Sequence, residues 1–252
     1  ILFNPLAGGR RSGALVERLR SEHPDARIIQ SGGPGGAREL VQDLKLERED
    51  TLAVLGGDGT IHQAVSGLFD GADEALPTLA VFPSGSGNAL ATALAIGSTS
   101  IAEATLHGGQ ERRIDVARVK TDSGTSHAIN VIGWGLSARV TLLSDKMRSS
   151  RGLPYTRAAL RELLFGDIAA ISARYDNSPE GMDLLGLACL TPEAGGGMPV
   201  APDALLDDGA LDLVRVKPIS RLPLLCLTPP FLILFLSLLF VLSPMAISDC
   251  CL

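Results

Sequence analysis

Short apolar runs alternate with glycine-rich turns and amphipathic stretches through the first third of the chain. Apolar residues at Ile61, Ala64, Val65 and Leu68 follow the i, i+3, i+4, i+7 spacing of a helix face. The pattern predicts strands at 1–3, 26–30, 51–55 and 79–82, with helices at 37–44 and from residue 61. Because strand, glycine turn and helix repeat in this order, we expect a parallel sheet with helices on both faces.

The pattern changes after about residue 112. Strand-like stretches separated by turns lie at 114–119, 128–132, 169–175, 184–190 and 210–216, with one helix near 155–164. They predict a second, mostly antiparallel domain. The fold class is therefore α/β, with a parallel α/β domain at 1–110 and an antiparallel β-domain at 111–225.

The last segment, 226–252, has a different composition. No residue from Leu222 to Ser248 is charged, and the apolar run at 231–242 is bracketed by Pro230 and Pro244. A spanning helix needs ~20 residues, so this run is short for a membrane span. Three interpretations remain open: a marginal membrane anchor, a buried helix, or a segment that takes no part in the fold.

Net charge and cysteine spacing indicate which partners and which redox environment to expect. The net charge of −6 argues against nucleic acid as a partner. Four cysteines without metal-ligand spacing predict reduced intracellular thiols. The sequence shows no signal peptide and indicates no particular protein partner.

Three glycine-rich turns follow predicted strands and precede predicted helices. They lie at 4–10, 56–60 and 83–88. Such turns meet at the carboxyl edge of a parallel sheet, where ligands bind. Glycines let backbone N–H groups approach phosphate oxygens, and helix N-termini favour anions. Together the turns predict a nucleotide site, although any one of them alone is also compatible with a plain tight turn.

Asp58 lies between two glycines at the mouth of this predicted site. A carboxylate there is suited to take the proton from an attacking hydroxyl in phosphoryl transfer. The alternative is that Asp58 caps the next helix, a role that Thr60 also suits.

The motifs resemble a known family. They are Asn4-Pro5-x-x-Gly-Gly, Gly56-Gly57-Asp58-Gly59-Thr60, Pro83-Ser84-Gly85-Ser86-Gly87-Asn88-Ala89-Leu90-Ala91 and Asp208-Gly209-x-Leu-Asp-Leu. Because these motifs occur in this order over residues 1–225, the chain resembles the diacylglycerol-kinase catalytic family. The run Asn-Ala-Leu-Ala after the third turn most resembles sphingosine kinases.

The resemblance implies a cleft for ATP with Mg²⁺ between the α/β domain and a β-sandwich that holds the lipid. Asp58 matches the catalytic aspartate. The positions that match ATP-binding residues are Asn4, Pro5, Gly9, Arg10, Ser31, Gly56, Gly57, Gly59, Thr60, Ser84, Gly85, Ser86, Gly87, Asn88 and Arg148. The resemblance identifies no protein ligand for a metal.

The chain departs from the sphingosine-kinase pattern at the lipid head-group motif. Where those kinases read Gly-x-x-Ala-Asp-Val-Asp, residues 135–141 place Arg139 and Thr141 at the two acidic positions. These two residues are the candidate lipid contacts, and they weaken the match to a cationic acceptor. The family also continues past residue 222 with further strands, so we expect an incomplete sandwich.

The resulting functional prediction is an ATP-dependent kinase acting on a sphingoid base or related lipid. The alternatives are a kinase for diacylglycerol or another lipid alcohol, and a catalytically inactive lipid- or nucleotide-binding module. A lipid substrate at a membrane surface implies a cytoplasmic, peripherally membrane-associated protein, with anchoring by the tail left open.

Overall fold

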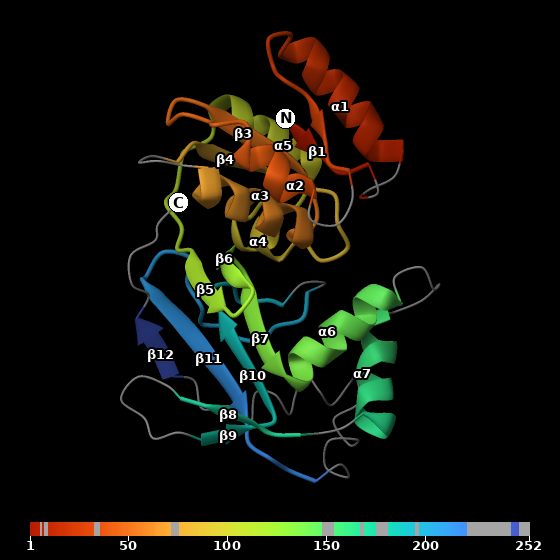
Figure 1. The fold of residues 1–252 in the computed structure, drawn as a ribbon. Coiled ribbons are helices and arrows are strands. Elements are labelled where there is room, and N and C mark those ends of the chain that lie inside the picture. Colours follow the sequence, from red (N-terminus) through yellow and green to blue (C-terminus); the bar gives the residue numbers. More distant parts are fainter. Residues whose placement is uncertain are drawn as a thin grey trace.

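The fold is described from a computed structural model. The described residues are 1–5, 7, 10–32, 36–71, 76–147, 154–166, 169–174, 181–194, 197–220 and 243–246. Their elements form an α/β part and an antiparallel β part, which lie one above the other in Figure 1. This arrangement confirms the predicted fold class.

The α/β part is built on a four-stranded parallel sheet. Its strands are β1 (Leu2–Phe3), β2 (Ile29–Gln30), β3 (Thr51–Gly56) and β4 (Thr78–Pro83), in the order β2-β1-β3-β4. All three strand pairs are parallel. Each predicted strand of this part is present, with bounds shifted by up to three residues.

Alternating side chains of β3 place helices on both faces of the sheet. Leu52 and Val54 belong to a buried cluster with α2 (Gly36–Gln42) and α3 (Asp58–Gly71). Ala53 and Leu55 face the other way, toward α1 (Arg10–Glu22) and α5 (Thr99–Gly108). Successive strand residues point to opposite faces, so a continuously apolar strand is what a doubly covered sheet requires.

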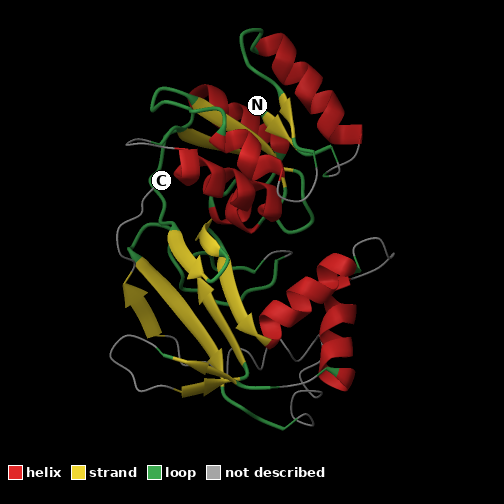
Figure 2. Ribbon diagram, in the orientation of Figure 1, coloured by secondary structure: helices red, strands yellow, loops and turns green. Residues whose placement is uncertain are grey.

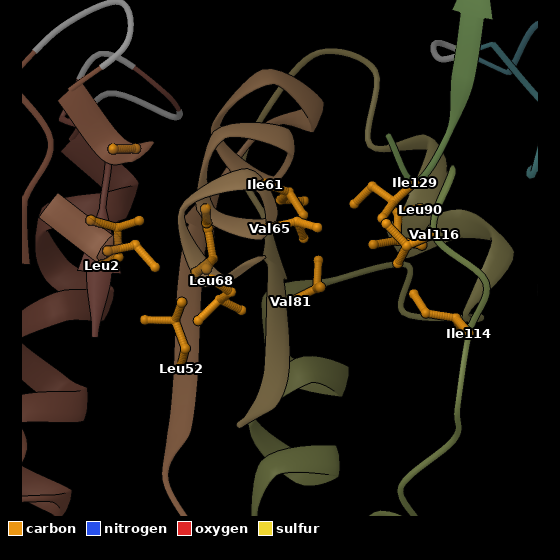
Figure 3. Close-up of a cluster of buried hydrophobic side chains, with 14 of the residues drawn as sticks. Leu2, Leu52, Ile61, Val65, Leu68, Val81, Leu90, Ile114, Val116 and Ile129 are labelled. Atoms are coloured by element: carbon orange, nitrogen blue, oxygen red, sulfur yellow. The ribbon is translucent and has the colours of Figure 1, made fainter. Parts of the chain in front are cut away.

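The larger cluster also includes residues that follow the α/β part in the sequence. Ile114, Val116 and Ile129 pack with α3 and with Leu90 of the short helix α4 (Ala89–Ala93), as Figure 3 shows. The backbone of Asp115 also donates to Leu206 O at 2.6 Å. The two parts therefore share buried contacts.

The β part is antiparallel (Figure 2). A hairpin of β5 (Ala117–Thr121) and β6 (Gly124–Ala128) leads into a sheet of order β12-β11-β10-β7. The sheet strands are β7 (Val131–Gly135), β10 (Leu185–Cys189), β11 (Ala210–Val216) and β12 (Ser243–Ala246). A small hairpin pairs β8 (Ile171–Ala173) with β9 (Gly181–Asp183).

Two helices flank this sheet, as Figure 1 shows. They are α6 (Leu136–Lys146) and α7 (Pro154–Phe165). The sequence predicts α7 but we did not predict α6. Leu136, Val140 and Leu143 belong to one apolar cluster and recur at helical spacing, so a signal for α6 was present.

The tail contributes β12, which pairs antiparallel with β11. These four residues therefore pair with the second sheet, which differs from the interpretation in which the whole segment takes no part in the fold. The rest of 226–252 lies outside the described residues. Among the described residues, no helix has the length and apolar character needed to cross a membrane.

Candidate functional site

Asn4 of the first turn and the second glycine turn lie where the strand order of the parallel sheet reverses. The chain moves from β1 to β2 on one side and then to β3 on the other side. Asn4 follows β1, and Gly57 and Asp58 follow β3, so they flank this switch point. In open α/β sheets the crevice at that position binds ligands.

The second and third turns are in backbone contact. A Cβ added to Gly85 would lie 2.4 Å from the Cα of Gly57, and a Cβ added to Gly57 would lie 2.9 Å from the Cα of Gly85. Any side chain at either position would force the two turns apart. These two glycines are needed for close approach, and the backbone amides of both turns gather at one place because of it.

The first turn is tied to the second by a side-chain hydrogen bond. Asn4 Nδ2 donates to Thr60 Oγ1 at 3.1 Å, and Thr60 is buried. The backbone of Asn4 also donates to Leu55 O at 3.0 Å. Thr60 therefore joins two turns, and the described contacts give it no capping role.

Asp58 links three segments of the chain. It is the first residue of α3, and its Oδ1 accepts from the backbone N of Ala89 at 2.8 Å. The same oxygen accepts from Asn130 Nδ2 at 3.1 Å. The carboxylate therefore lies at the N-terminus of α4, and the helix that it caps is α4 rather than its own α3.

Asn130 is a site residue that we did not predict from the sequence. It lies in the turn between β6 and β7, and its Oδ1 is buried with no hydrogen-bond partner among the described residues. The pattern at 128–132 predicts one strand, whereas β6 ends at Ala128, β7 begins at Val131, and only residues 129–130 lie between them. The signal was a single polar side chain within an apolar run.

The third turn holds its shape through Asn88. Asn88 has φ 57° and ψ 38°, and its side chain bonds both ways with Gly85: Gly85 N donates to Oδ1 and Nδ2 donates to Gly85 O, each at 2.9 Å. Asparagine tolerates this left-handed conformation better than most residues. Within the same turn Ser86 is exposed and Gly87 is half-buried.

The hydroxyl of Ser84 in this turn is buried without a hydrogen-bond partner among the described residues. Such orphaned polar atoms are rare, and a ligand oxygen is a natural partner. Backbone amides and this hydroxyl suit phosphate oxygens. The residues present therefore fit the phosphates of ATP.

Of the other predicted ATP-binding positions, Pro5, Ser31 and Gly59 lie at the same edge of the sheet. Ser31 follows β2 and is buried, and its Oγ donates to Phe3 O at 3.4 Å. Pro5 lies in the first turn and Gly59 is exposed in the first turn of α3. Arg10 begins α1, but its side chain is not described, and Gly9 and Arg148 lie outside the described residues.

The two predicted lipid contacts lie on α6, in the second part of the chain. Arg139 forms an ion pair with Glu162 of α7, with its Nη2 2.8 Å from Oε2. Thr141 is exposed, and its hydroxyl donates to Ser137 O at 3.0 Å. The Arg139 ion pair joins α6 to α7, a structural role that the motif alone did not indicate.

Each part of the chain matches a known domain family. Residues 1–119 match the diacylglycerol kinase catalytic domain, and residues 130–232 match the YegS C-terminal NAD kinase beta sandwich-like domain. A YegS-like lipid kinase of Xanthomonas campestris is 32% identical over 83% of this chain and 69% of its own length. The chain belongs to the family of YegS-like lipid kinases and diacylglycerol kinases.

A second relative and a solved structure are consistent with this family assignment. A diacylglycerol kinase of Bacillus subtilis is 28% identical over 86% of this chain and 73% of its own length. Among solved structures, a diacylglycerol kinase of Bacillus anthracis has a TM-score of 0.64 at 24% identity, covering 96% of this chain and 80% of that chain. At that identity the structural likeness shows the fold alone. None of these three is named a sphingosine kinase, so that finer likeness stays a prediction.

Proposed function

We propose that this family member is an ATP-dependent lipid kinase that transfers the γ-phosphoryl group of MgATP to a hydroxyl of a lipid alcohol. The observation that carries the proposal is the position of Asp58. Its carboxylate lies in the second glycine turn, next to the residue that follows the third turn, and accepts hydrogen bonds from Ala89 N and Asn130 Nδ2. The family of lipid kinases to which the chain belongs supports the same reaction.

In the proposed reaction, Asp58 accepts the proton of the acceptor hydroxyl as its oxygen attacks the γ-phosphorus. The bond from the γ-phosphorus to the bridging oxygen breaks, and ADP leaves with that oxygen. Two hydrogen bonds from described residues end on Oδ1 of Asp58 and orient the carboxylate, and Oδ2 is the oxygen proposed to take the proton. Bound Mg²⁺ would neutralise phosphate charge.

The turn backbones would position the phosphates. The contact between Gly57 and Gly85 brings the backbone amides of two turns together, and the Ser84 hydroxyl, which has no partner among the described residues, would donate to a phosphate oxygen. Preorganised donors of this kind stabilise developing charge without reorganising during the reaction.

For the acceptor, we propose diacylglycerol or a related neutral lipid alcohol. Relatives of this chain are named diacylglycerol kinases. A cationic sphingoid base, the other acceptor predicted from the sequence, is supported by the run Asn88-Ala89-Leu90-Ala91. The arginine at 139 is paired with Glu162, so its charge does not decide between the two acceptors.

The test is a transfer assay with γ-labelled ATP and Mg²⁺ on mixed micelles that contain diacylglycerol, a sphingoid base or a long-chain alcohol, with NAD as a water-soluble control acceptor. The proposal expects labelled lipid and no labelled NAD. Thermal stabilisation by MgATP without product on any acceptor would instead identify an inactive nucleotide-binding module.

A further inference from the structure

A second cluster of ligand-type side chains lies at the ends of α1 and α5, on the sheet face opposite α2 and α3. Glu22 is the last residue of α1 and His23 follows it, while His107 lies in the last turn of α5. The sequence separation between the two segments gives no hint of this contact.

The geometry of the cluster suits one small ion. Each of the three residues offers a ligand atom, and these atoms all lie within 4.8 Å of one another. His107 Nε2 is 3.6 Å from Glu22 Oε2, and the two imidazole rings stack at 5.2 Å with an interplanar angle of 14°. Two ligand atoms on one tetrahedral Zn²⁺ lie about 3.3 Å apart, so binding would require side-chain rotations that bring atoms now up to 4.8 Å apart closer together.

A second, independent observation points to a ligand here. Nε2 of His23 is buried and has no hydrogen-bond partner among the described residues. A buried ring nitrogen without a partner needs an explanation, and a metal ion supplies one. The ends of α1 and α5 also present carbonyl groups, whose partial negative charge favours a cation.

We propose that Glu22, His23 and His107 form a binding site for a divalent transition metal of the Zn²⁺ class. Two imidazole nitrogens and one carboxylate oxygen suit Zn²⁺, Ni²⁺ or Cu²⁺, whereas Mg²⁺ and Ca²⁺ prefer oxygen ligands alone. With three protein ligands, a water completes the tetrahedron. The site is separate from Asp58 and from the Mg²⁺ that accompanies ATP.

A bound metal ion would link the C-terminal ends of α1 and α5. The same two helices are already joined by Arg18, whose Nε donates to Glu103 Oε1 at 2.8 Å. Because α1 leads directly from the first glycine turn, the ion would stabilise the helix that follows the proposed nucleotide site. The effect expected is on stability.

The test uses the full chain without an affinity tag, stripped with EDTA and titrated with Zn²⁺. Calorimetry should show one Zn²⁺ per chain. At a free Zn²⁺ concentration of ~100 Kd, Tm should rise by ~5–10 °C. Co²⁺ should give visible absorption bands without a thiolate charge-transfer band, because the ligands are nitrogen and oxygen.

Three variants test whether Zn²⁺ binds at this site rather than elsewhere on the chain. His107→Gln, at a half-exposed side chain, and Glu22→Gln should each weaken Zn²⁺ binding at least ~10-fold, the loss that even outer-sphere partners of a metal can cause. His62→Gln, which removes a histidine elsewhere, should leave the affinity unchanged. Equal Zn²⁺ affinity in His107→Gln and in the unmodified chain, or no Zn²⁺ binding at all, would overturn the proposal.

Discussion

Asn130 donates a hydrogen bond from Nδ2 to Oδ1 of Asp58 over 3.1 Å. The bond joins the turn before β7 to the turn after β3. The candidate base of the α/β part is thus oriented by a residue of the β part. Positioning of the carboxylate depends on contact between the two parts of the chain.

Removing this bond should reduce turnover. For Asn130→Ala we expect kcat to fall by ~10–100-fold, since a hydrogen bond to a charged group is worth about 1.5–3 kcal/mol. The KM for ATP should change less. Steady-state kinetics on the lipid acceptor measure both, with Ser123→Ala in the exposed β5–β6 turn as the control. A kcat within twofold of the unmodified chain would show that Asn130 does not position Asp58.

A methyl group at Gly85 should disrupt the second and third turns. Its Cβ would lie 2.4 Å from the Cα of Gly57, and backbone cannot move as a flexible side chain can. We expect Gly85→Ala to lower Tm by several degrees and to weaken MgATP binding. Gly13→Ala is the matched control: no atom lies within 4 Å of the added Cβ, and Ala in a helix gains ~0.5–1 kcal/mol, so Tm should stay or rise. Scanning calorimetry compares them, and equal Tm values for both variants would contradict the packing described.

A carboxylate at Thr141 should favour a cationic acceptor. Thr141 is exposed, whereas a carboxylate at Arg139 would face Glu162 and disturb the α6–α7 contact. For Thr141→Asp we expect the ratio of kcat/KM for a sphingoid base over diacylglycerol to rise by ~10-fold, about 1.4 kcal/mol. In Thr141→Asn the new side chain has the shape of aspartate without its charge, so this variant should leave the ratio unchanged. If both variants behave alike, the head group is recognised elsewhere.

Two histidines at the contact between α3 and β6 should make stability depend on pH. Burial is the largest cause that lowers the pKa of both His62 and His127 from 6.5, and the charge of Arg38 lowers both pKa values further. The pKa of His127 is also lowered by Arg118 and raised by Asp70. Folding therefore favours the neutral rings. The stability that they contribute is present above pH 6.5 and is lost as the pH falls through the lowered pKa values.

We therefore expect Tm to fall as the pH is lowered from about 7.5 to about 5, and the fall to be smaller in the double variant His62→Gln/His127→Gln. Thermal unfolding at a series of pH values measures this slope. An identical slope in the unmodified chain and the double variant would exclude these residues as its source.

The sequence predicted the parallel sheet and its glycine turns because both leave local signals. Continuous apolar runs such as 52–55 indicate doubly covered strands, and glycines at 56, 57 and 85 mark the turns that follow them. The prediction that Asp58 lies at the mouth of a nucleotide site follows from the same rule. What each of these residues contacts was not predictable from the local pattern.

The unpredicted features depend on contacts between distant segments. Asn130 meets Asp58 across 72 positions, and the Arg139–Glu162 pair spans 23. Helix α6 was missed for a different reason: Leu136, Val140 and Leu143 carried the helical spacing, but residues 135–141 were interpreted only as a ligand motif. Local periodicity indicates elements, while side-chain pairing requires the fold.

The most direct test of the account is the lipid kinase activity of Asp58→Asn. Asparagine keeps the size of the side chain and an oxygen that can accept from Ala89 N, so the fold and MgATP binding should persist. Losing the general base should lower kcat by ~10²–10⁴-fold. The account predicts this loss in a variant whose Tm and affinity for MgATP stay close to those of the unmodified chain. Near-normal kcat in a correctly folded Asp58→Asn variant would contradict it.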